Sequence, residues 1–349
     1  MKRTIFLAIA AVAVLCASSC SKMKEKPEPL TLGQGEPVLC SFGVAGLDVL
    51  ETKSTGLESD EKGIEAEKKI NSLQVFVFTA EGNLAASEKA ENASSLTLTV
   101  NAGTGYSMYA VVNTEDWTTS VSKVADLEAK VTEALGASNA NANFAMRGKL
   151  TDQTVSSTSK EFTIEVERVA AKVVLRKITN ALPTAAGALT IEGIYVSNVV
   201  TSSAMFAATI PEGATWINQR GVYDNLSSYA WFADKLETAV DVANGAAYST
   251  AHTFYAAANP TETDSSAETF GPRFTRLVVK AKIQDVVYYY PVSFNKELPA
   301  LTANSYIDVT NLTIKHLGSD DPDKPIETDA ITVSVTVKDW TKTEKEVTL

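Results

Sequence analysis

Cysteine and histidine are scarce in this chain. Its 349 residues include three cysteines and two histidines. Cys16 and Cys20 both lie within the first 20 residues, so Cys40 is the one cysteine left for the body of the protein. One thiol cannot form an internal disulfide, and we therefore expect side-chain burial alone to hold the fold. His252 and His316 are far apart in sequence, and neither belongs to a paired zinc-binding motif.

Other catalytic motifs are absent as well. The sequence has no Gly-x-Ser-x-Gly elbow and no glycine-rich phosphate loop. Cys40 has no basic neighbour in sequence, so we interpret it as a packing residue rather than a nucleophile. Asp320, Asp321 and Asp323 suggest a calcium loop, but they lack the glycine and closing glutamate of an EF-hand, which favours a solvated linker. We expect no enzyme activity, no metal and no cofactor.

Positive charge is in the minority. Lysine and arginine number 31 against 42 acidic residues, which gives a net charge of −11. Such a chain repels nucleic acid and anionic lipid headgroups, so we expect no nucleic-acid partner. After the first 20 residues, no apolar run approaches the length needed to span a bilayer.

The N-terminus has the three parts of an export signal. Lys2 and Arg3 precede an apolar run over residues 5–15, and small residues at 17–19 precede Cys20. A cysteine directly after small residues resembles a bacterial lipobox, in which Cys20 is acylated with palmitate and becomes the first residue of the mature chain. An ordinary signal peptide is the alternative. We predict a signal peptide over residues 1–19 and lipidation at Cys20.

A short strand is predicted between two polar segments. Residues 21–37 are charged and contain three prolines, which is typical of a flexible tether. In the next stretch Val38, Cys40, Phe42 and Val44 fall on one face, the pattern of a half-buried strand. Residues 51–69 are again polar and have no apolar period, so we expect an exposed loop that is open to proteolysis.

The rest of the sequence predicts an almost entirely β fold. Strands are expected at 73–78, 162–166 and 170–178, the last two bent near Arg168, and further short strands follow up to residue 340. One helix is expected over residues 120–136, with Ser120 or Ser122 at its start and Gly136 at its end. Many short strands with turn signals are typical of β-sandwiches. The length favours two of them, an N-terminal domain over 54–167 and a C-terminal domain over 168–349, preceded by a tether and first strand over 20–53.

Three consecutive tyrosines could offer rings for stacking on sugars. Alternation in a strand predicts that Tyr289 is buried while Tyr288 and Tyr290 are exposed. Because tyrosine is also a good strand former, we interpret the triplet as strand sequence.

Four stretches resemble the FimA-type major fimbrillins, the subunits of type V pili of Bacteroidales bacteria. They are INSLQVFVFTAEGNLAASEKAENAS, GTGYSMYAVVNTEDW, VERVAAKVVLRKI and SYIDVTNLTIKHLGSDDPDKPIETDAITVSVTVKDW, which lie in this order over most of the chain. The resemblance implies two transthyretin-like β-sandwich domains and export as a lipoprotein to the outer membrane. It also implies polymerisation with like subunits, contact with anchor and tip subunits, and a place in an adhesive fimbrium at the cell surface.

The resemblance further implies activation by an extracellular protease that removes the N-terminal strand. In the family this cut usually follows an arginine, but none occurs between Arg3 and Arg147. The aligned residue is Lys53, with Lys62, Lys68 and Lys69 as alternatives. The protease would therefore be trypsin-like or lysine-directed.

The pattern of the C-terminal tail gives this mechanism a physical basis. Loss of the strand over 38–44 would uncover four apolar side chains, worth roughly 6–12 kcal/mol, and would leave an unpaired sheet edge. The tail over 331–349 offers a replacement, in which Ile331, Val333, Val335 and Val337 alternate with polar residues. Donation of this strand to a neighbour repeats head to tail and builds a filament. The alternative is that the tail is an edge strand of its own domain.

Two other functions remain open at this point. One is a monomeric surface lipoprotein that binds glycans through aromatic side chains such as Trp117, Trp231 or Tyr288–Tyr290. The other is a secreted hydrolase that uses a pair of carboxylates. Because the chain retains an apolar alternating tail, the fimbrillin hypothesis favours a stalk subunit.

Overall fold

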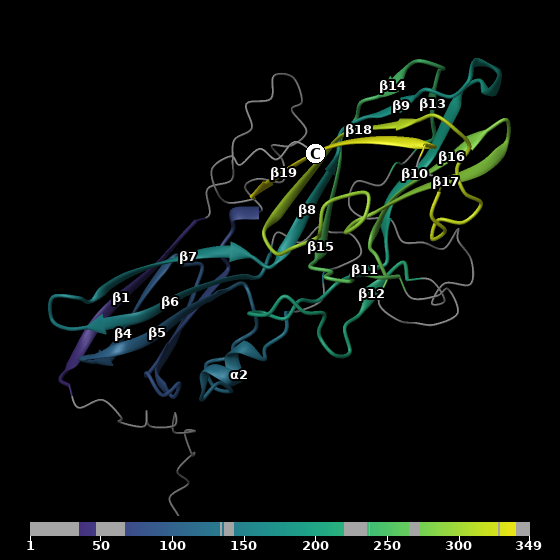
Figure 1. Cartoon of the computed structure of the whole chain (residues 1–349). Coiled ribbons are helices and arrows are strands. Elements are labelled where there is room, and N and C mark those ends of the chain that lie inside the picture. Colours follow the sequence, from purple (N-terminus) through teal and green to yellow (C-terminus); the bar gives the residue numbers. More distant parts are fainter. Residues whose placement is uncertain are drawn as a thin grey trace, which may run out of the picture.

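The computed structural model describes residues 35–46, 67–132, 135, 143–219, 236, 238–264, 273–326 and 329–339. The predictions for Cys20, Lys53, Lys62, Gly136 and Trp231 fall outside these residues. The described strands form an N-terminal and a C-terminal group, joined where β7 leads into β8 (Figure 1).

The N-terminal group contains seven strands and one short helix. They are β1 (Pro37–Ala45), β2 (Ser72–Phe78), β3 (Leu84–Glu91), β4 (Ser95–Asn101), β5 (Gly103–Val112), α2 (Val124–Glu128), β6 (Met146–Val155) and β7 (Glu161–Arg168). The strand order is β3-β2-β5-β6-β7-β1-β4. The first part of β7 pairs with β1, and its last three residues pair with β6. Because β7 changes partners along its length, the sheet folds over on itself and encloses a core.

That core lies between the two halves of the folded sheet. Cys40 and Phe42 of β1 and Phe162 of β7 contribute to it from one side, while Val75 of β2 and Met108 of β5 contribute from the other. Inward residues alternate with outward ones along β4 and β7, as the period of two requires.

Every described residue of β2 is buried, as predicted for a strand covered on both faces. The second face is covered by a smaller cluster in which Phe76 and Phe78 of β2 pack with Trp117, Val121 and Leu127. The segment around α2 therefore covers the outer side of this sheet.

The predicted helix over 120–136 is much shorter than expected, since α2 ends at Glu128. Its buried Leu127 fits the prediction, but its N-cap is Lys123 rather than Ser120 or Ser122, and the Asp126 carboxylate accepts the backbone N–H of Lys123 at 2.9 Å. Beyond it, Val131 bridges Ala204, and the Thr132 N–H donates to the Ser203 carbonyl at 2.9 Å. Backbone pairing with residues 201–205 prevails over the helical periodicity, because the β-branched Val131 and Thr132 suit an extended chain better.

The C-terminal group contains two larger sheets and a two-stranded ribbon. Its elements are β8 (Ala170–Leu175), β9 (Ile178–Asn180), η2 (Thr184–Ala186), β10 (Leu189–Ser197), β11 (Val199–Val200), β12 (Trp216–Ile217), β13 (Val240–Val242), β14 (Ala247–Tyr248), β15 (His252–Ala257), β16 (Arg276–Ile283), β17 (Val286–Ser293), β18 (Ser305–Ile314) and β19 (Ile331–Asp339). One sheet has the order β13-β10-β16-β17. The other has the order β14-β9-β18-β8-β15, with β19 added on β18. Their facing side chains form one shared core.

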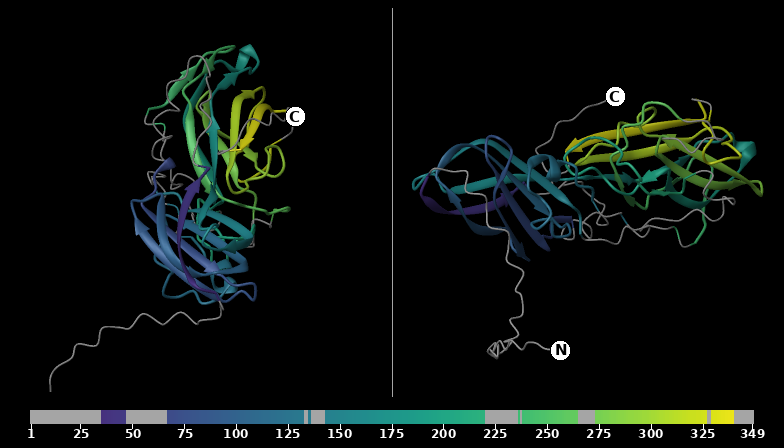
Figure 2. Two further views of the ribbon diagram at one scale, coloured as in Figure 1. Left: turned by 90° about the vertical axis from the view of Figure 1, so that its left-hand side faces the viewer. Right: turned by 90° about the horizontal axis from the view of Figure 1, so that it is seen from below.

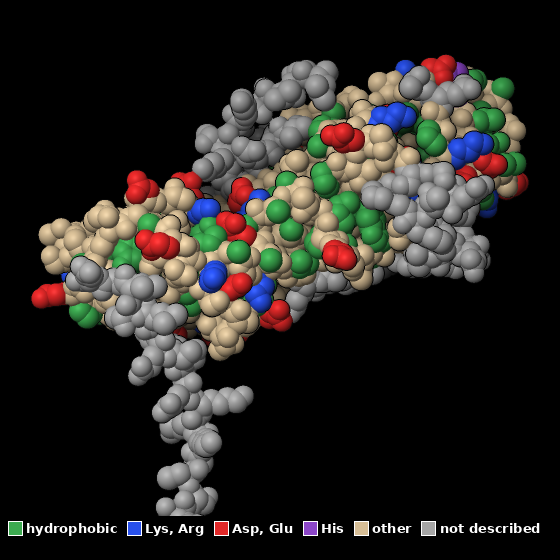
Figure 3. Space-filling view, turned by 60° about the horizontal axis from the view of Figure 1, so that its bottom comes forward, with side chains coloured by type: hydrophobic (Ala, Val, Ile, Leu, Met, Phe, Trp, Pro, Cys, Tyr) green, Lys and Arg blue, Asp and Glu red, His purple; other side chains and the backbone are tan. Residues whose placement is uncertain are grey.

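The all-β sandwich prediction is confirmed. The bend near Arg168 separates β7 from β8, and a second break at Arg176–Lys177 separates β8 from β9, so the strand predicted over 170–178 is divided. The two groups lie end to end, which gives the described chain an elongated shape (Figure 2). On the face drawn in Figure 3, acidic and basic side chains are interspersed and neither sign forms a continuous field. No helix among the described residues is both long and apolar enough to cross a membrane.

Candidate functional site

The first strand lies inside its sheet rather than at an edge. On one side β1 pairs antiparallel with β4, from Pro37 opposite Asn101 to Gly43 opposite Ser95. On the other side it pairs in parallel with β7, from Ser41 opposite Glu161 to Ala45 opposite Glu165. Removal of β1 would therefore open a slot with a free strand edge along each wall. We call this space, bounded by β4 and β7, the β1 slot.

The inward side chains of β1 fill the slot as the sequence predicted. Cys40 and Phe42 are fully buried, and Val38 and Val44 pack against the same core with partial exposure. The Phe42 ring stacks on Phe162 of β7, with 5.3 Å between ring centroids. The sequence offered no signal for this pairing, because the two residues are 120 positions apart.

Two glycines mark the ends of the described stretch around β1. A side chain at Gly35 would overlap the backbone of Ala102, and one at Gly46 would lie 2.9 Å from the Val166 carbonyl oxygen. Gly46 also has a φ of +87°, a conformation that glycine adopts without strain. Glycine is therefore required at both places where the chain enters and leaves the slot.

The Cys40 thiol is a buried packing group. Burial raises its pKa, an effect that the positive charge of Lys160 partly opposes. The Sγ atom lies 3.6 Å from the Val38 carbonyl oxygen, its one hydrogen-bond contact among the described residues. A thiol in this environment is protonated and unreactive, as the sequence interpretation held.

The tail strand occupies an edge of its own C-terminal group. β19 pairs antiparallel with β18 from Ile331 opposite Ile314 to Asp339 opposite Ser305. Ile331 is buried, Val333 and Val335 are half-buried against the C-terminal core, and Thr332 and Ser334 are exposed. The side chain of Val337 lies outside the described residues. The edge-strand alternative thus describes the state of this chain, in which β19 has one partner strand.

Two of the four predicted cleavage positions can be described. Lys68 is half-buried and Lys69 is exposed, directly before β2. The Asn113 side-chain amide donates to the Lys69 carbonyl at 2.8 Å, and its Oδ1 accepts the Asn71 N–H at 2.7 Å. The backbone from the Lys69 carbonyl to Asn71 is therefore held by Asn113.

The acidic segment before the tail is not a solvated linker throughout. Asp323 is 3% exposed and forms ion pairs with Arg273, at 2.6 Å, and with Arg276. The Asn198 amide also donates to it at 2.8 Å. The linker interpretation is therefore wrong for Asp323, because two arginines at the start of β16 compensate its buried charge. Among the described residues, no group of three or more histidine, cysteine or acidic side chains is arranged to hold a metal ion.

The aromatic residues considered for sugar stacking are largely buried. Tyr289 is buried as expected, but Tyr290 is fully buried rather than exposed, and its hydroxyl donates to the His316 carbonyl at 3.1 Å. The alternation holds with the opposite phase. Tyr290 faces the core between the two C-terminal sheets and the half-buried Tyr288 packs against that core, while Tyr289 lies on the other face of β17 in a small cluster with Tyr195 and Val278. Trp117 is 2% exposed. Tyr289, Tyr290 and Trp117 therefore offer no open stacking surface.

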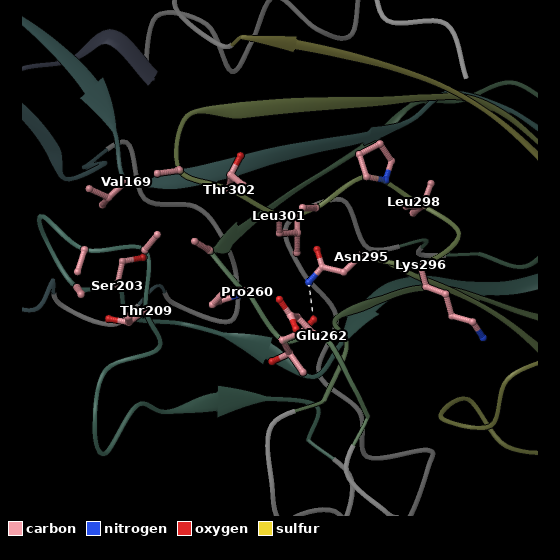
Figure 4. A pocket seen from close by; sticks show the side chains of 18 of the residues that line it. Val169, Ser203, Thr209, Pro260, Glu262, Asn295, Lys296, Leu298, Leu301 and Thr302 are labelled. Atoms are coloured by element: carbon pink, nitrogen blue, oxygen red, sulfur yellow. Dashed lines mark hydrogen bonds between the residues drawn. The ribbon is translucent and has the colours of Figure 1, made fainter.

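A cavity of about 660 Å³ lies where loops of the C-terminal group meet Arg147 and Val169 (Figure 4). Its walls include Ser203, Pro260, Asn295 and Leu301. No described lining residue is aromatic, so the cavity lacks a ring on which a sugar could stack.

These features define an all-β protein of two strand groups with an inserted first strand and an edge-strand tail. Residues 44–216 match the model of a family described as major fimbrial subunit protein (FimA). The resemblance to the FimA-type major fimbrillins is thereby confirmed over these residues. The family consists of structural subunits rather than enzymes, and it implies a place in fimbriae at the cell surface.

Solved structures of this kind have the same fold. A fimbrilin (FimA) from Porphyromonas gingivalis W83 has a TM-score of 0.58 at 16% identity, over 88% of this chain and 98% of that chain. A protein assigned to cell adhesion from Bacteroides eggerthii DSM 20697 has a TM-score of 0.58 at 17% identity, over 88% of this chain and 97% of that chain. Another from Parabacteroides distasonis ATCC 8503 has a TM-score of 0.57 at 15% identity, over 88% and 98%. No curated protein sequence matches the chain.

Proposed function

We propose that this protein is a fimbrial stalk subunit that polymerises when β1 is removed and the tail strand of a neighbour takes its place. The observation that carries the proposal is the position of β1 between β4 and β7. A strand cut out of this position leaves two unpaired edges over an apolar core, and such edges are templates for another strand.

The number of strand partners and the burial of side chains both favour β19 in the slot of a neighbour over β19 in its own domain. Among the described strands of its own chain β19 pairs with β18 alone, whereas in the β1 slot it would pair with strands on both sides. β1 and β19 are each nine residues long, and each presents apolar residues at every second position. The donor strand loses its hydrogen bonds to one neighbour and the packing of one buried and two half-buried side chains, and it gains hydrogen bonds to two neighbours over a closed core.

Export, lipidation and cleavage precede the exchange. The precursor is exported with its signal over residues 1–19 and anchored in the outer membrane by lipid on Cys20. A trypsin-like or lysine-directed protease cuts at Lys53, with Lys62 as an alternative, and releases the lipidated segment together with β1. We also propose the domain limits of 54–167 and 168–349. Anchor and tip subunits are the expected partners at the ends of the filament.

Trypsin treatment of the chain without its leader tests the function. We expect loss of the N-terminal segment that contains β1, followed by ladders of oligomers on a denaturant-free gel and filaments in electron micrographs. A processed chain that remains monomeric would contradict the proposal and would favour the monomeric glycan-binding alternative.

A further inference from the structure

Glu67 is a buried acid at the point where the chain enters the N-terminal group for the second time. It is 1% exposed and lies five residues before β2. A carboxylate in this environment needs close partners, because burial of an unpaired charge is costly. Neither the fold of β2 nor the β1 slot accounts for its presence.

Three side chains from three different strands converge on Glu67. Lys172 of β8 donates to its Oε1 at 2.8 Å, and the Tyr255 hydroxyl of β15 donates to the same oxygen at 2.5 Å. Arg168, at the end of β7, donates to the Glu67 backbone carbonyl through Nε at 2.9 Å and through Nη2 at 2.8 Å. Burial lowers the pKa of Arg168 to about 10, which leaves it charged at neutral pH.

The residues that follow Glu67 are also fixed. The Asn113 amide binds the Lys69 carbonyl and the Asn71 N–H, and the Asn71 side chain donates to Asn143 at 2.6 Å. The chain from Glu67 to Asn71 is thus tied to both strand groups without any contribution from β1.

We propose that the buried contacts of Glu67 make the chain downstream of it resistant to processing and keep that chain in place after β1 has left. We call these contacts, made with Arg168, Lys172 and Tyr255, the Glu67 latch. This inference rests on the proposed removal of β1. A protease needs several residues of extended, accessible backbone around the bond it cuts, so cleavage after Lys68 or Lys69 requires local opening of the latch. The latch therefore sets a downstream limit on the processing region and excludes two of the four lysines suggested by the sequence.

Timed trypsin digestion of the chain without its leader tests the latch, with products identified by intact mass. In the unaltered chain we expect early products that have lost β1, and none that begins at Lys69 or Ile70. Tyr255→Phe removes one hydrogen bond to a charged group, and products that begin at Lys69 or Ile70 should then form about 10-fold faster or more. Glu67→Gln should act in the same direction. Glu91→Gln breaks an exposed ion pair with Lys89 and serves as the control, with no change expected.

Two results would overturn the latch. One is cleavage after Lys68 or Lys69 in the unaltered chain at a rate comparable to the cut that releases β1. The other is an unchanged product pattern in both Tyr255→Phe and Glu67→Gln. Failure of the proposed function has a different signature, because the unaltered chain would then lose β1 and yet form no filaments.

Discussion

At the scale of single residues, Phe42 and Leu39 have opposite roles on one strand. Phe42 is fully buried and stacks on Phe162, whereas Leu39 points outward and is 64% exposed. Docking of β1 in the slot therefore depends on its inward side chains. Phe42 contributes strongly to it, whereas Leu39, three positions earlier in the same strand, contributes little.

Phe42→Ala should destabilise the intact precursor by about 3–5 kcal/mol, because it removes a fully buried ring from a packed core. Urea unfolding measures the loss. Leu39→Ala is the matched control and should change stability by less than about 0.5 kcal/mol. Equal effects of the two substitutions would show that β1 does not dock through its inward face.

Cys40 makes the docking of β1 dependent on pH. Its pKa is raised by burial, so the docked strand holds the thiol proton more tightly than the free strand does. The stabilising contribution is complete below the ordinary thiol pKa of about 8.5 and is lost as pH rises through the higher pKa of the docked state. We expect thiol labelling of Cys40 to be slow at pH 7 and to accelerate above pH 9 by more than thiolate formation in a free peptide explains. Cys40→Ala should remove this pH dependence from β1 release, and labelling at the free-peptide rate at neutral pH would refute the docking.

At the scale of elements, β1 and β19 have the same length and the same alternating pattern of apolar residues, but they lie in different surroundings. β1 has two partner strands and β19 has one. In its own domain, Thr332 and Ser334 of β19 are exposed while Ile331, Val333 and Val335 pack against the core, and docking in the slot would require the same division of faces.

Val335→Asp should abolish filament formation while the monomer still folds, because Val335 is only half-buried at home but would face a closed core in the slot. Ser334→Asp places the same charge on the exposed face and should leave filaments intact. Electron micrographs and circular dichroism of the two processed variants measure assembly and folding. Normal filaments from Val335→Asp would rule out β19 as the donor.

The sequence predicted the elements that carry a clear apolar period. β1 and β2 have such a pattern, and their predicted limits agree with the structure within one residue. β3 and β6 went unpredicted because LAASEKAE and MRGKLTDQTV mix polar and small residues and owe their strand form to their neighbours. The helix predicted over 120–136 is longer than the observed one. Its apolar period continues beyond Glu128, but the chain there pairs through its backbone with residues 201–205 instead.

The residues of the candidate site also differ in whether the sequence could predict them. The inward set of β1 could be predicted from alternation alone, because each member lies within one strand. Phe162, Glu67 and the arginines around Asp323 could not be found, since each acts through a contact between segments distant in sequence. Periodicity is a local signal and carries no information about which strands meet.

At the scale of the whole molecule, the net charge opposes assembly. The chain carries −11, and like subunits in a filament repel one another. Filament formation after processing should therefore accelerate between about 0.01 and 0.15 M salt, as the Debye length falls from about 30 to 8 Å. Light scattering at matched protein concentration measures the rate. Slower assembly with added salt would indicate that attraction between charges, rather than strand exchange over an apolar core, drives the contact.

Two networks of buried polar contacts fix segments that the proposed exchange would leave in place. The Glu67 latch holds the junction, and the Asp323 ion pairs fix the segment before the tail to β16. β1 and β19 lie outside both networks. The proposed strand exchange would therefore leave both networks unbroken.

The measurement that tests strand exchange most directly is disulfide trapping in the processed chain. All three native cysteines lie at or before residue 40, so removal of the β1 segment leaves no competing thiol. Thr97 and Ser334 are both exposed, so Thr97→Cys on β4 and Ser334→Cys on β19 report whether β19 has entered a slot. Thr99→Cys and Thr332→Cys extend the test to neighbouring registers. Asn311→Cys with Ser334→Cys reports the home position, because these residues are opposite each other in β18 and β19.

We expect ladders of disulfide-linked multimers from at least one β4–β19 pair after processing and none before it. Oxidation of the precursor should form the bond between positions 311 and 334 and thereby block assembly, whereas filaments that assemble under reducing conditions and are oxidised afterwards should not form this bond. Filaments that retain the 311–334 bond and show no β4–β19 link would contradict the exchange of β1 for a neighbour's β19.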